Sequence, residues 1–174
     1  MTPDLDLQLK VVIKALRDTV MPALDPKQAA AAEQLGLSIA TLAMVRERLP
    51  YLAARTWIDL ADAVALGQRI IALSTDALPD SDLAEAAALL RDPCPPVDAL
   101  DLARRRVLAG ISTAIETACD ETVEALMRIV TEEAGRTTDM ARAWSKIAGF
   151  EPDPAQIPEL ATLISEPRRM PVDE

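Results

Sequence analysis

The chain has 174 residues, and its 18 basic and 28 acidic side chains give a net charge of −10. This length favours one domain with a sizeable core, and the acidic balance argues against nucleic acid and anionic membrane surfaces as partners. Charges interrupt every apolar run before it reaches the ~20 residues that cross a bilayer. The N-terminus is acidic where a secretory signal would be basic. We therefore expect a cytoplasmic protein that binds neither nucleic acid nor membrane.

The sequence contains no histidine. This absence excludes Ser-His-Asp and Cys-His catalysis, a phosphohistidine relay, and zinc or haem sites with histidine ligands. It also excludes the di-iron sites of ferritin-like bundles. Two cysteines, Cys94 and Cys119, are too few for a thiolate metal site. We expect no cofactor and leave open whether the protein is an enzyme, with a non-catalytic role favoured.

The pattern of apolar residues predicts an all-α fold. With 31 alanines, 23 leucines and only four aromatic residues, the core is aliphatic and suited to close-packed helices. No stretch shows the alternation and β-branched enrichment of strands. Thirteen prolines divide the chain into intervals of helical length. The prolines therefore set the boundaries of the predicted helices.

The first two helices are predicted over residues 4–21 and 26–49, each with apolar residues at the i, i+3, i+4 spacing of one helix face. Pro22 is expected to end the first helix. Asp25 followed by Pro26 is typical of an N-cap and a first helical position. The short connection favours antiparallel packing of the two helices.

The third helix is predicted over residues 51–78, and a short helix over 81–91 begins with a pattern that resembles a capping box. The longest helix is predicted over residues 98–134, with Gly135 as its C-terminal cap residue. Short helices are expected over 138–148 and about 156–165, the second within a proline-rich segment.

The four longest predicted helices, 4–21, 26–49, 51–78 and 98–134, have the lengths and single strong faces of an antiparallel four-helix bundle. We predict one bundle domain over residues 1–150, with the short helices as connectors or lids. A partly disordered, proline-rich tail is predicted over residues 151–174.

Apolar residues away from the main helix faces form secondary stripes. They are Leu7 and Val11, Leu37 and Met44, and Leu66 and Leu73. Contiguous exposed apolar patches usually mark interaction sites, so we predict a homo-oligomer interface here, with a dimer most expected. The alternative is that the short helices cover these residues.

Two arginines, Arg46 and Arg104, fall on the buried side of the helical wheel. One interpretation is that their stems pack while the charges reach water or a carboxylate. The other is that one or both face a cavity and hold the carboxylate or phosphate of a small ligand.

Acidic residues recur at helical spacing in two segments. They are Asp59-x-x-Asp62 and Asp120-Glu121-x-x-Glu124, with Glu116 one turn earlier. This spacing resembles the Mg²⁺-binding carboxylate pairs of all-α nucleotide pyrophosphatases, with the segments in the opposite order. The resemblance implies a metal site with the ligands Asp59, Asp62, Glu116 and Glu121. A metal ion held there would bridge substrate phosphates. The alternative is a solvated face, since Glu116 falls opposite the apolar stripe of its helix.

Three functions remain open. The favoured hypothesis is a non-catalytic helical bundle that acts as a homo-oligomeric accessory or protein-interaction module. The first alternative is a binding domain for an apolar or amphipathic small molecule, whose carboxylate or phosphate is held by Arg46 or Arg104; a pocket that reaches either arginine would favour it. The second is a Mg²⁺-dependent enzyme that acts on a nucleotide or another phosphate ester. A helical transcription regulator is less favoured, because the chain has no basic DNA-reading module.

Overall fold

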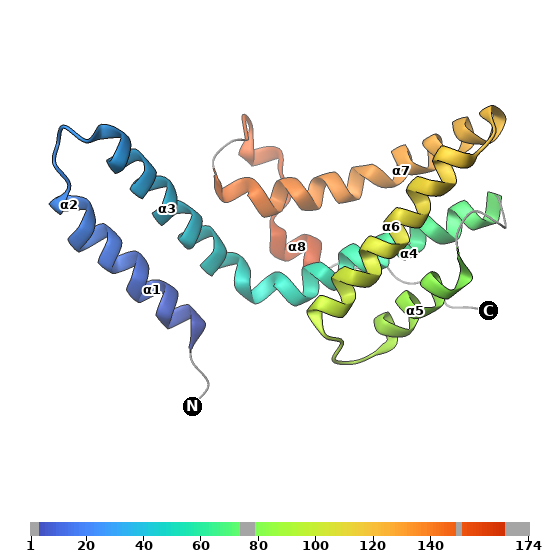
Figure 1. Cartoon of the computed structure of the whole chain (residues 1–174), viewed down its shortest axis with the longest axis horizontal. Helices are drawn as coiled ribbons and strands as arrows, with labels where there is room; N and C mark the ends of the chain where they lie inside the picture. Colours follow the sequence, from blue (N-terminus) through green and yellow to red (C-terminus); the bar gives the residue numbers. More distant parts are fainter. Residues whose placement is uncertain (1–3, 74–78, 149–150, 166–174) are drawn as a thin grey trace. The chain divides into compact units, whose positions relative to one another are not determined.

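The computed structural model describes residues 4–73, 79–148 and 151–165, and every regular element within them is helical (Figure 1). The α-helices are α1 (Leu5–Ala15), α2 (Met21–Ala23), α3 (Ala29–Arg48), α4 (Leu52–Leu73), α5 (Asp80–Arg91), α6 (Val97–Thr117), α7 (Asp120–Ser145) and α8 (Leu160–Ser165). The all-α fold class predicted from the sequence is confirmed. None of the helices in the described part of the chain is long and apolar enough to cross a membrane.

The chain divides into two compact units. The N-terminal unit consists of residues 1–50 and 144–154, and the central unit of residues 51–143 and 155–174. The predicted helices are thus shared between two units, so a single four-helix bundle is not confirmed. The predicted division into a bundle over residues 1–150 and a tail over 151–174 stays a prediction, and residues 166–174 lie outside the described residues.

The N-terminal unit is built on an antiparallel hairpin of α1 and α3 (Figure 1). Ile13 and Ile39 are the buried apolar side chains of the two helices. At the open end of the hairpin, Arg46 binds the carboxylate of Asp6. Arg48, only 8% exposed, donates from Nε to the backbone carbonyl of Trp144 at 3.0 Å. This bond fastens the returning segment 144–154 to the end of α3.

The central unit has its core where α4, α5 and α6 pack together. Its fully or nearly fully buried side chains include Leu60, Val64 and Ile70 of α4, Ala86 of α5, and Leu100 and Val107 of α6. Buried alanines on all three helices let their backbones approach closely, because interaxial distance depends on the side chains at the contact. Leu100, Val107 and Ile111 form the face of α6 that packs into this core.

Helix α7 contacts α4 through a stripe of side chains at alternating spacings of three and four residues. The stripe is Leu126, Ile129, Glu133, Arg136, Met140 and Ala143. Its apolar members are buried, whereas its two charged members pair with residues of α4. Long charged side chains therefore bridge α4 and α7. Elsewhere in the unit, buried alanines let the helices approach closely.

The single helix predicted over residues 98–134 is wrong, because α6 ends at Thr117 and Ala118 adopts an extended backbone with ψ 148°. The hydroxyl groups of Thr113 and Thr117 donate to carbonyls four residues earlier, a pattern that weakens and bends helices. The carbonyl of Cys119 then accepts from two amides of the next turn and starts α7. Acidic residues in the first turn favour a new helix, because they interact well with its dipole.

The predicted end at Gly135 and the separate helix over 138–148 are also wrong, since α7 continues through Gly135 to Ser145. Glycine costs a helix about 1 kcal/mol relative to alanine. The packed stripe of α7 extends on both sides of Gly135, so tertiary contacts outweigh this cost. Residues 146–148 add only a 3-10 turn.

The ends of the N-terminal helices differ from the predicted ends by only a few residues. Residues 16–20 form a π-helical turn, and α2 carries the helix past Pro22 to Ala23. Proline clashes with the carbonyl four residues earlier, and a wider π turn relieves that clash. The second helix begins at Ala29 rather than 26, because Asp25 accepts from the amide of Lys27 in a local turn.

The remaining predictions of helices hold with altered ends. Helix α4 lies within the predicted range 51–78, of which residues 74–78 lie outside the described residues. The predicted short helix over 81–91 is confirmed as α5. The helix predicted at 156–165 is shorter, since α8 begins only after Pro158, which cannot donate a helical hydrogen bond.

Replacing Leu60 with alanine tests the central core. Leu60 is fully buried, so we expect Leu60→Ala to lower the free energy of unfolding by about 2–5 kcal/mol. Leu102→Ala is the matched control, because Leu102 is 49% exposed on α6, and its change should stay within about 0.5 kcal/mol. Urea unfolding followed by circular dichroism measures both. Equal losses in the two variants would contradict this core.

Candidate functional site

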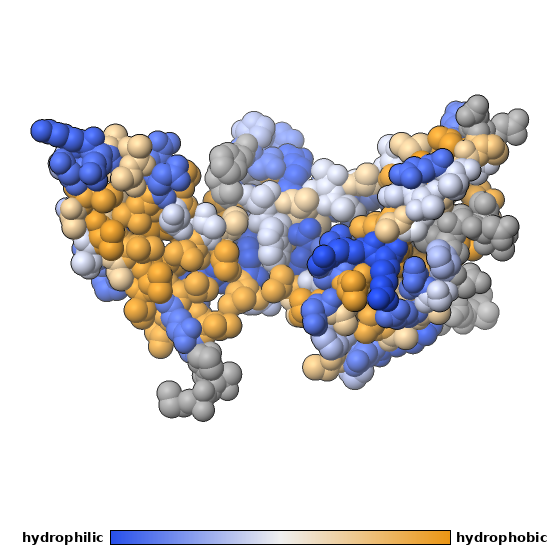
Figure 2. Space-filling view, in the orientation of Figure 1, coloured by the Kyte–Doolittle hydropathy of each residue, from blue (hydrophilic) through white to orange (hydrophobic). Residues whose placement is uncertain are grey.

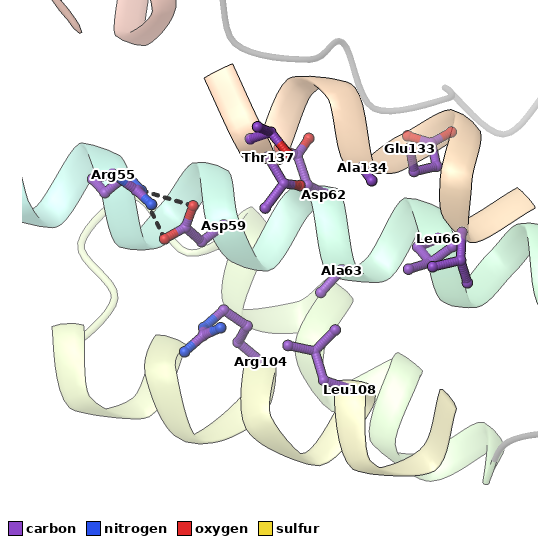
Figure 3. A pocket seen from close by; sticks show the side chains of 12 residues that line it. Arg55, Asp59, Asp62, Ala63, Leu66, Arg104, Leu108, Glu133, Ala134 and Thr137 are labelled. Carbon is purple, nitrogen blue, oxygen red and sulfur yellow. Dashed lines mark hydrogen bonds and ion pairs between the residues drawn. The ribbon is translucent and has the colours of Figure 1, made fainter. Parts of the chain in front are cut away.

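A pocket of about 320 Å³ opens between α4, α6 and α7 in the central unit (Figure 3). Its apolar lining is Ala63, Leu66, Leu108, Val130 and Ala134. Its polar lining is Arg55, Asp59, Asp62, Arg104, Glu133, Thr137 and Thr138. The volume is in the range of small-molecule sites, which commonly lie between helices of a bundle.

Arg55 and Asp59 form one charged wall of the pocket. They lie one turn apart on α4, and Arg55 Nε donates to both carboxylate oxygens of Asp59 at 2.8 Å. Arg55 Nη1 also donates to the carbonyl of Met140 on α7, at 3.4 Å. The spacing along α4 brings Arg55 and Asp59 together, whereas the contact with Met140 depends on the packing of α7 beside α4.

Three ion pairs join α4 to α7 beside the pocket. Arg136 donates from Nε to Asp62 at 3.2 Å, with the Asp62 side chain only 13% exposed. Arg69 donates to Glu133 and to Glu132, each at 2.6 Å. These hydrogen bonds raise the pKa of Arg69, so its guanidinium stays charged. The pairs therefore hold the α7 wall of the pocket in place.

Arg104 reaches the pocket from α6 and belongs to a shared ion pair. Asp101 accepts hydrogen bonds from both Arg104, at 3.0 Å, and Arg105. These two hydrogen bonds lower the pKa of Asp101, and the hydrogen bond from Arg105 has the larger effect on it. One carboxylate thus serves two guanidinium groups.

The two arginines predicted from the sequence have different surroundings. Arg104 lines the pocket, as expected for a ligand-binding arginine. Arg46 makes two hydrogen bonds to Asp6, from Nε at 2.7 Å and from Nη2 at 3.3 Å, and it lies in the other unit. The interpretation in which the charge meets a carboxylate of the chain therefore describes both arginines, since Arg104 pairs with Asp101.

Of the four predicted metal ligands, Asp59, Asp62 and Glu116 do not gather in one place. Asp59 and Asp62 both line the pocket, and each is paired with an arginine. Glu116 is exposed near the end of α6, and the side chain of Glu121 lies outside the described part of the structure. Within the part of the chain that the structure describes, no three acidic or cysteine side chains lie close enough to hold a metal ion.

The predicted interface residues fall on several surfaces. Leu7, Val11 and Leu37 are exposed in the N-terminal unit, where Met44 is half-buried. In the central unit Leu73 is exposed, whereas Leu66 packs against the core and lines the pocket. An oligomer interface through these residues stays a prediction.

One continuous apolar surface does cover the α1–α3 hairpin (Figure 2). Leu5 and Val12, 54% and 46% exposed, lie two turns apart on one side of α1. In an antiparallel pair this side of α1 continues onto the side of α3 that carries Val45, which is 44% exposed. We call this surface the hairpin face; its members are Leu5, Gln8, Leu9 and Val12 of α1, Leu16 of the π-helical turn that follows, and Ser38, Leu42 and Val45 of α3. No member is charged.

The sequence pattern missed the arginines and the glutamate that build the α4–α7 contact. Arg55 and Arg69 fall outside the apolar stripe of α4, and Arg136 follows Gly135, where the helix was expected to end. The spacing of Glu133 and Arg136 within the long stripe of α7 is the signal that could have identified them. Recognising it required treating α7 as one helix through Gly135.

The lowered pKa of Asp101 predicts a specific pH dependence. A carboxyl group whose pKa is lower in the folded state stabilises the protein above its unfolded-state pKa, and this contribution is lost as the pH falls through the folded-state value. We therefore expect wild type to exceed Asp101→Asn in unfolding free energy above pH 3.8. The difference should shrink as the pH falls further. Urea unfolding of both proteins across this range measures it; a difference that grows on acidification would contradict the assignment.

The Asp62–Arg136 pair should couple more strongly than an exposed pair. A double-mutant cycle of Asp62→Ala and Arg136→Ala should give a coupling of about 1 kcal/mol or more, because both side chains are largely buried. The same cycle on Lys14 and Asp18, which are well exposed, should give about 0.5 kcal/mol or less. Equal coupling in the two cycles would show that burial adds nothing to the α4–α7 contact.

Comparison of the chain with protein-family models, with curated protein sequences and with solved structures finds no match. The candidate function is therefore argued from the pocket and the hairpin face alone. Both features belong to folded units of this chain, and each has its own chemistry. The hairpin face is apolar and uncharged, whereas the pocket combines an apolar lining with five charged side chains.

Proposed function

We propose that the protein is a non-catalytic interaction module that forms a homodimer through its hairpin face. The support comes first from the distribution of exposed apolar side chains. Among the described residues, eight of the twelve large apolar side chains that are exposed belong to the N-terminal unit. Three of the eight, Leu5, Val12 and Val45, lie on the hairpin face, and contiguous exposed apolar patches usually mark interaction sites.

The size of the N-terminal unit explains why it needs a partner. Two helices and a short returning segment can bury only one side of each helix, and isolated helices are marginally stable in water. A second layer that covers the hairpin face would bury the side that the hairpin leaves open. The partner would thus contribute to the stability of the unit as well as to binding.

The charge distribution favours a second copy as the partner. Residues 1–50 carry six acidic and six basic side chains, so the whole net charge of −10 falls on residues 51–174. Two copies that meet through their neutral hairpins therefore place the strongly acidic parts outside the contact. Because no residue of the hairpin face is charged, the face meets no like charge when it packs against itself.

The geometry of the face fits a two-fold contact. Two antiparallel helix hairpins stacked through their apolar faces make a four-helix bundle, the commonest way in which such hairpins bury their surfaces. A two-fold axis through the centre of the face makes the contact isologous, so each copy supplies the same residues. The dimer would therefore form a four-helix bundle from two hairpins.

A pair of neighbouring valines on α1 tests this proposal. We expect Val12→Glu to weaken dimerisation by at least about tenfold, since it places a charge in an apolar contact. Val11→Glu is the matched control, because Val11 is 58% exposed and points about 100° away from Val12 around the helix. Light scattering after size-exclusion chromatography, over a range of protein concentrations, measures the subunit number of each variant. Circular dichroism confirms that both remain folded.

The outcomes separate the competing surfaces. A wild-type protein that is monomeric at all concentrations would overturn the proposal. Dissociation by Val11→Glu but not by Val12→Glu would overturn the hairpin face and favour the stripe of Leu7 and Val11 expected from the sequence. Equal dissociation by both variants would show that charge anywhere on α1 disrupts assembly, which contradicts a contact restricted to the hairpin face.

A further inference from the structure

The pocket between α4, α6 and α7 has no part in the proposed dimer, so its chemistry calls for a separate explanation. Its floor is apolar. In Figure 3, Ala63 and Leu108 lie next to Arg104, and Leu66 lies further along. In small-molecule sites, apolar side chains of this kind contact the hydrocarbon part of a ligand, whereas a few polar groups fix its orientation.

The carboxylates that line the pocket already have partners within the protein. The ion pairs are Asp59 with Arg55, Asp62 with Arg136, and Glu133 with Arg69. Each of these three carboxylates is matched by a guanidinium group of the chain. None of them therefore calls for a cationic group on a ligand.

Arg104 differs from these carboxylates, because its contact with the protein uses few of its donors. Among the described residues it makes one hydrogen bond, from Nη2 to Oδ1 of Asp101 at 3.0 Å. The other oxygen of Asp101 accepts two hydrogen bonds from Arg105. A guanidinium group carries five N–H donors, and the Arg104 side chain is only 31% exposed. Partly buried N–H donors require acceptors, and a ligand in the pocket can supply them.

A carboxylate is the acceptor that fits Arg104 best. Its two oxygens accept a pair of parallel hydrogen bonds from one guanidinium group, and its single charge matches that of one arginine. A phosphate monoester carries about two negative charges at neutral pH. In this pocket it would also face Asp59, Asp62 and Glu133, and like charges repel more strongly where water is partly excluded. The lining therefore favours a ligand with one negative charge.

We propose that this pocket binds a small aliphatic monocarboxylate, with its carboxylate at Arg104 and its hydrocarbon chain over Ala63, Leu108 and Leu66. The floor limits the length of that chain. Leu66 lies seven residues beyond Asp59 on α4, roughly 10 Å at 1.5 Å per residue. The matching ligand class is a short or medium-length carboxylate, rather than a long fatty acid, an amine or a phosphate ester.

Probes with the same hydrocarbon chain test the head group on the full-length protein. They are hexanoate, hexanol, hexylamine and hexyl phosphate. Isothermal titration calorimetry should show that hexanoate binds at least about tenfold more tightly than hexanol or hexylamine, because only the carboxylate pairs with Arg104. Hexyl phosphate should also bind more weakly than hexanoate. One ligand per chain should bind, whatever the subunit number, because the pocket lies within one unit.

A comparison of butanoate with hexanoate tests the apolar floor. The two additional CH₂ groups of hexanoate should strengthen binding by about tenfold, since each becomes buried over the floor. Equal affinities of the two carboxylates would show that the hydrocarbon chain stays in water, which would overturn its placement over Ala63, Leu108 and Leu66.

Two variants of α6 test the role of the arginine. Arg104→Gln should weaken hexanoate at least about tenfold, because a hydrogen bond between charged groups is lost, and should leave hexanol unchanged. Arg106→Gln is the control, because Arg106 is on the same helix but binds Glu85 outside the pocket. It removes the same charge and should change neither affinity. Circular dichroism checks that each variant is folded, and the comparison of probes on the wild-type chain tests the proposal independently of both variants.

The contrary results are equally specific. Hexanol that binds as tightly as hexanoate would show an apolar cavity without a role for Arg104 and overturn the inference. Hexyl phosphate that binds as tightly would show a general anion site and overturn the assignment to carboxylates. Equal weakening by Arg104→Gln and Arg106→Gln would show a general effect of charge and overturn the pocket assignment. The absence of saturable hexanoate binding would also overturn the inference, and it would leave the proposed dimer untouched, since dimerisation is measured without ligand.

Discussion

The ion pairs between α4 and α7 set the architecture of the central unit. Alanines let α5 and α6 approach α4 closely, whereas the side chains of Asp62, Arg69, Glu133 and Arg136 bridge α4 and α7 with longer groups. The pocket lies beside these bridges and shares Asp62 and Glu133 with them. Removing one partner of such a pair costs more than the pair contributes, since it leaves a partly buried charge uncompensated. The charged bridges and the pocket are therefore one structural feature.

The two units distribute charge and apolar surface in opposite ways. The N-terminal unit is electrically neutral through residue 50 and holds most of the exposed apolar side chains, whereas the remainder of the chain carries all of the net charge. Net charge opposes non-specific association, so the neutral hairpin is the part of the chain best suited to the proposed dimer contact. This contact and the pocket belong to different units and use different residues.

The local chemistry of the site was only partly visible in the sequence. Arg104 was identified because an arginine among apolar positions of a helix needs a partner, and it does line the pocket. Asp59 and Asp62 were noticed for their spacing, which by itself does not distinguish a metal ligand from an acceptor for Arg55 or Arg136. Those partners come from one turn away on α4 and from a helix more than 70 residues further along the chain. Helical periodicity contains no information about contacts such as that between Asp62 and Arg136, which lie far apart in the sequence.

Hydrophobic periodicity and proline positions by themselves determined that the protein is all-α and where most helices lie, because both act within a few residues of the chain. The absence of histidine alone excluded whole classes of catalytic and metal sites. Only the tertiary structure decided that residues 98–134 are divided near Cys119 and that α7 continues through Gly135. It also decided which charges face a pocket and which side of α1 stays open. The continuation of α7 through Gly135 depends on packing whose energy exceeds the local cost of glycine, whereas the break near Cys119 follows hydrogen bonds of Thr113 and Thr117 that apolar periodicity does not reveal.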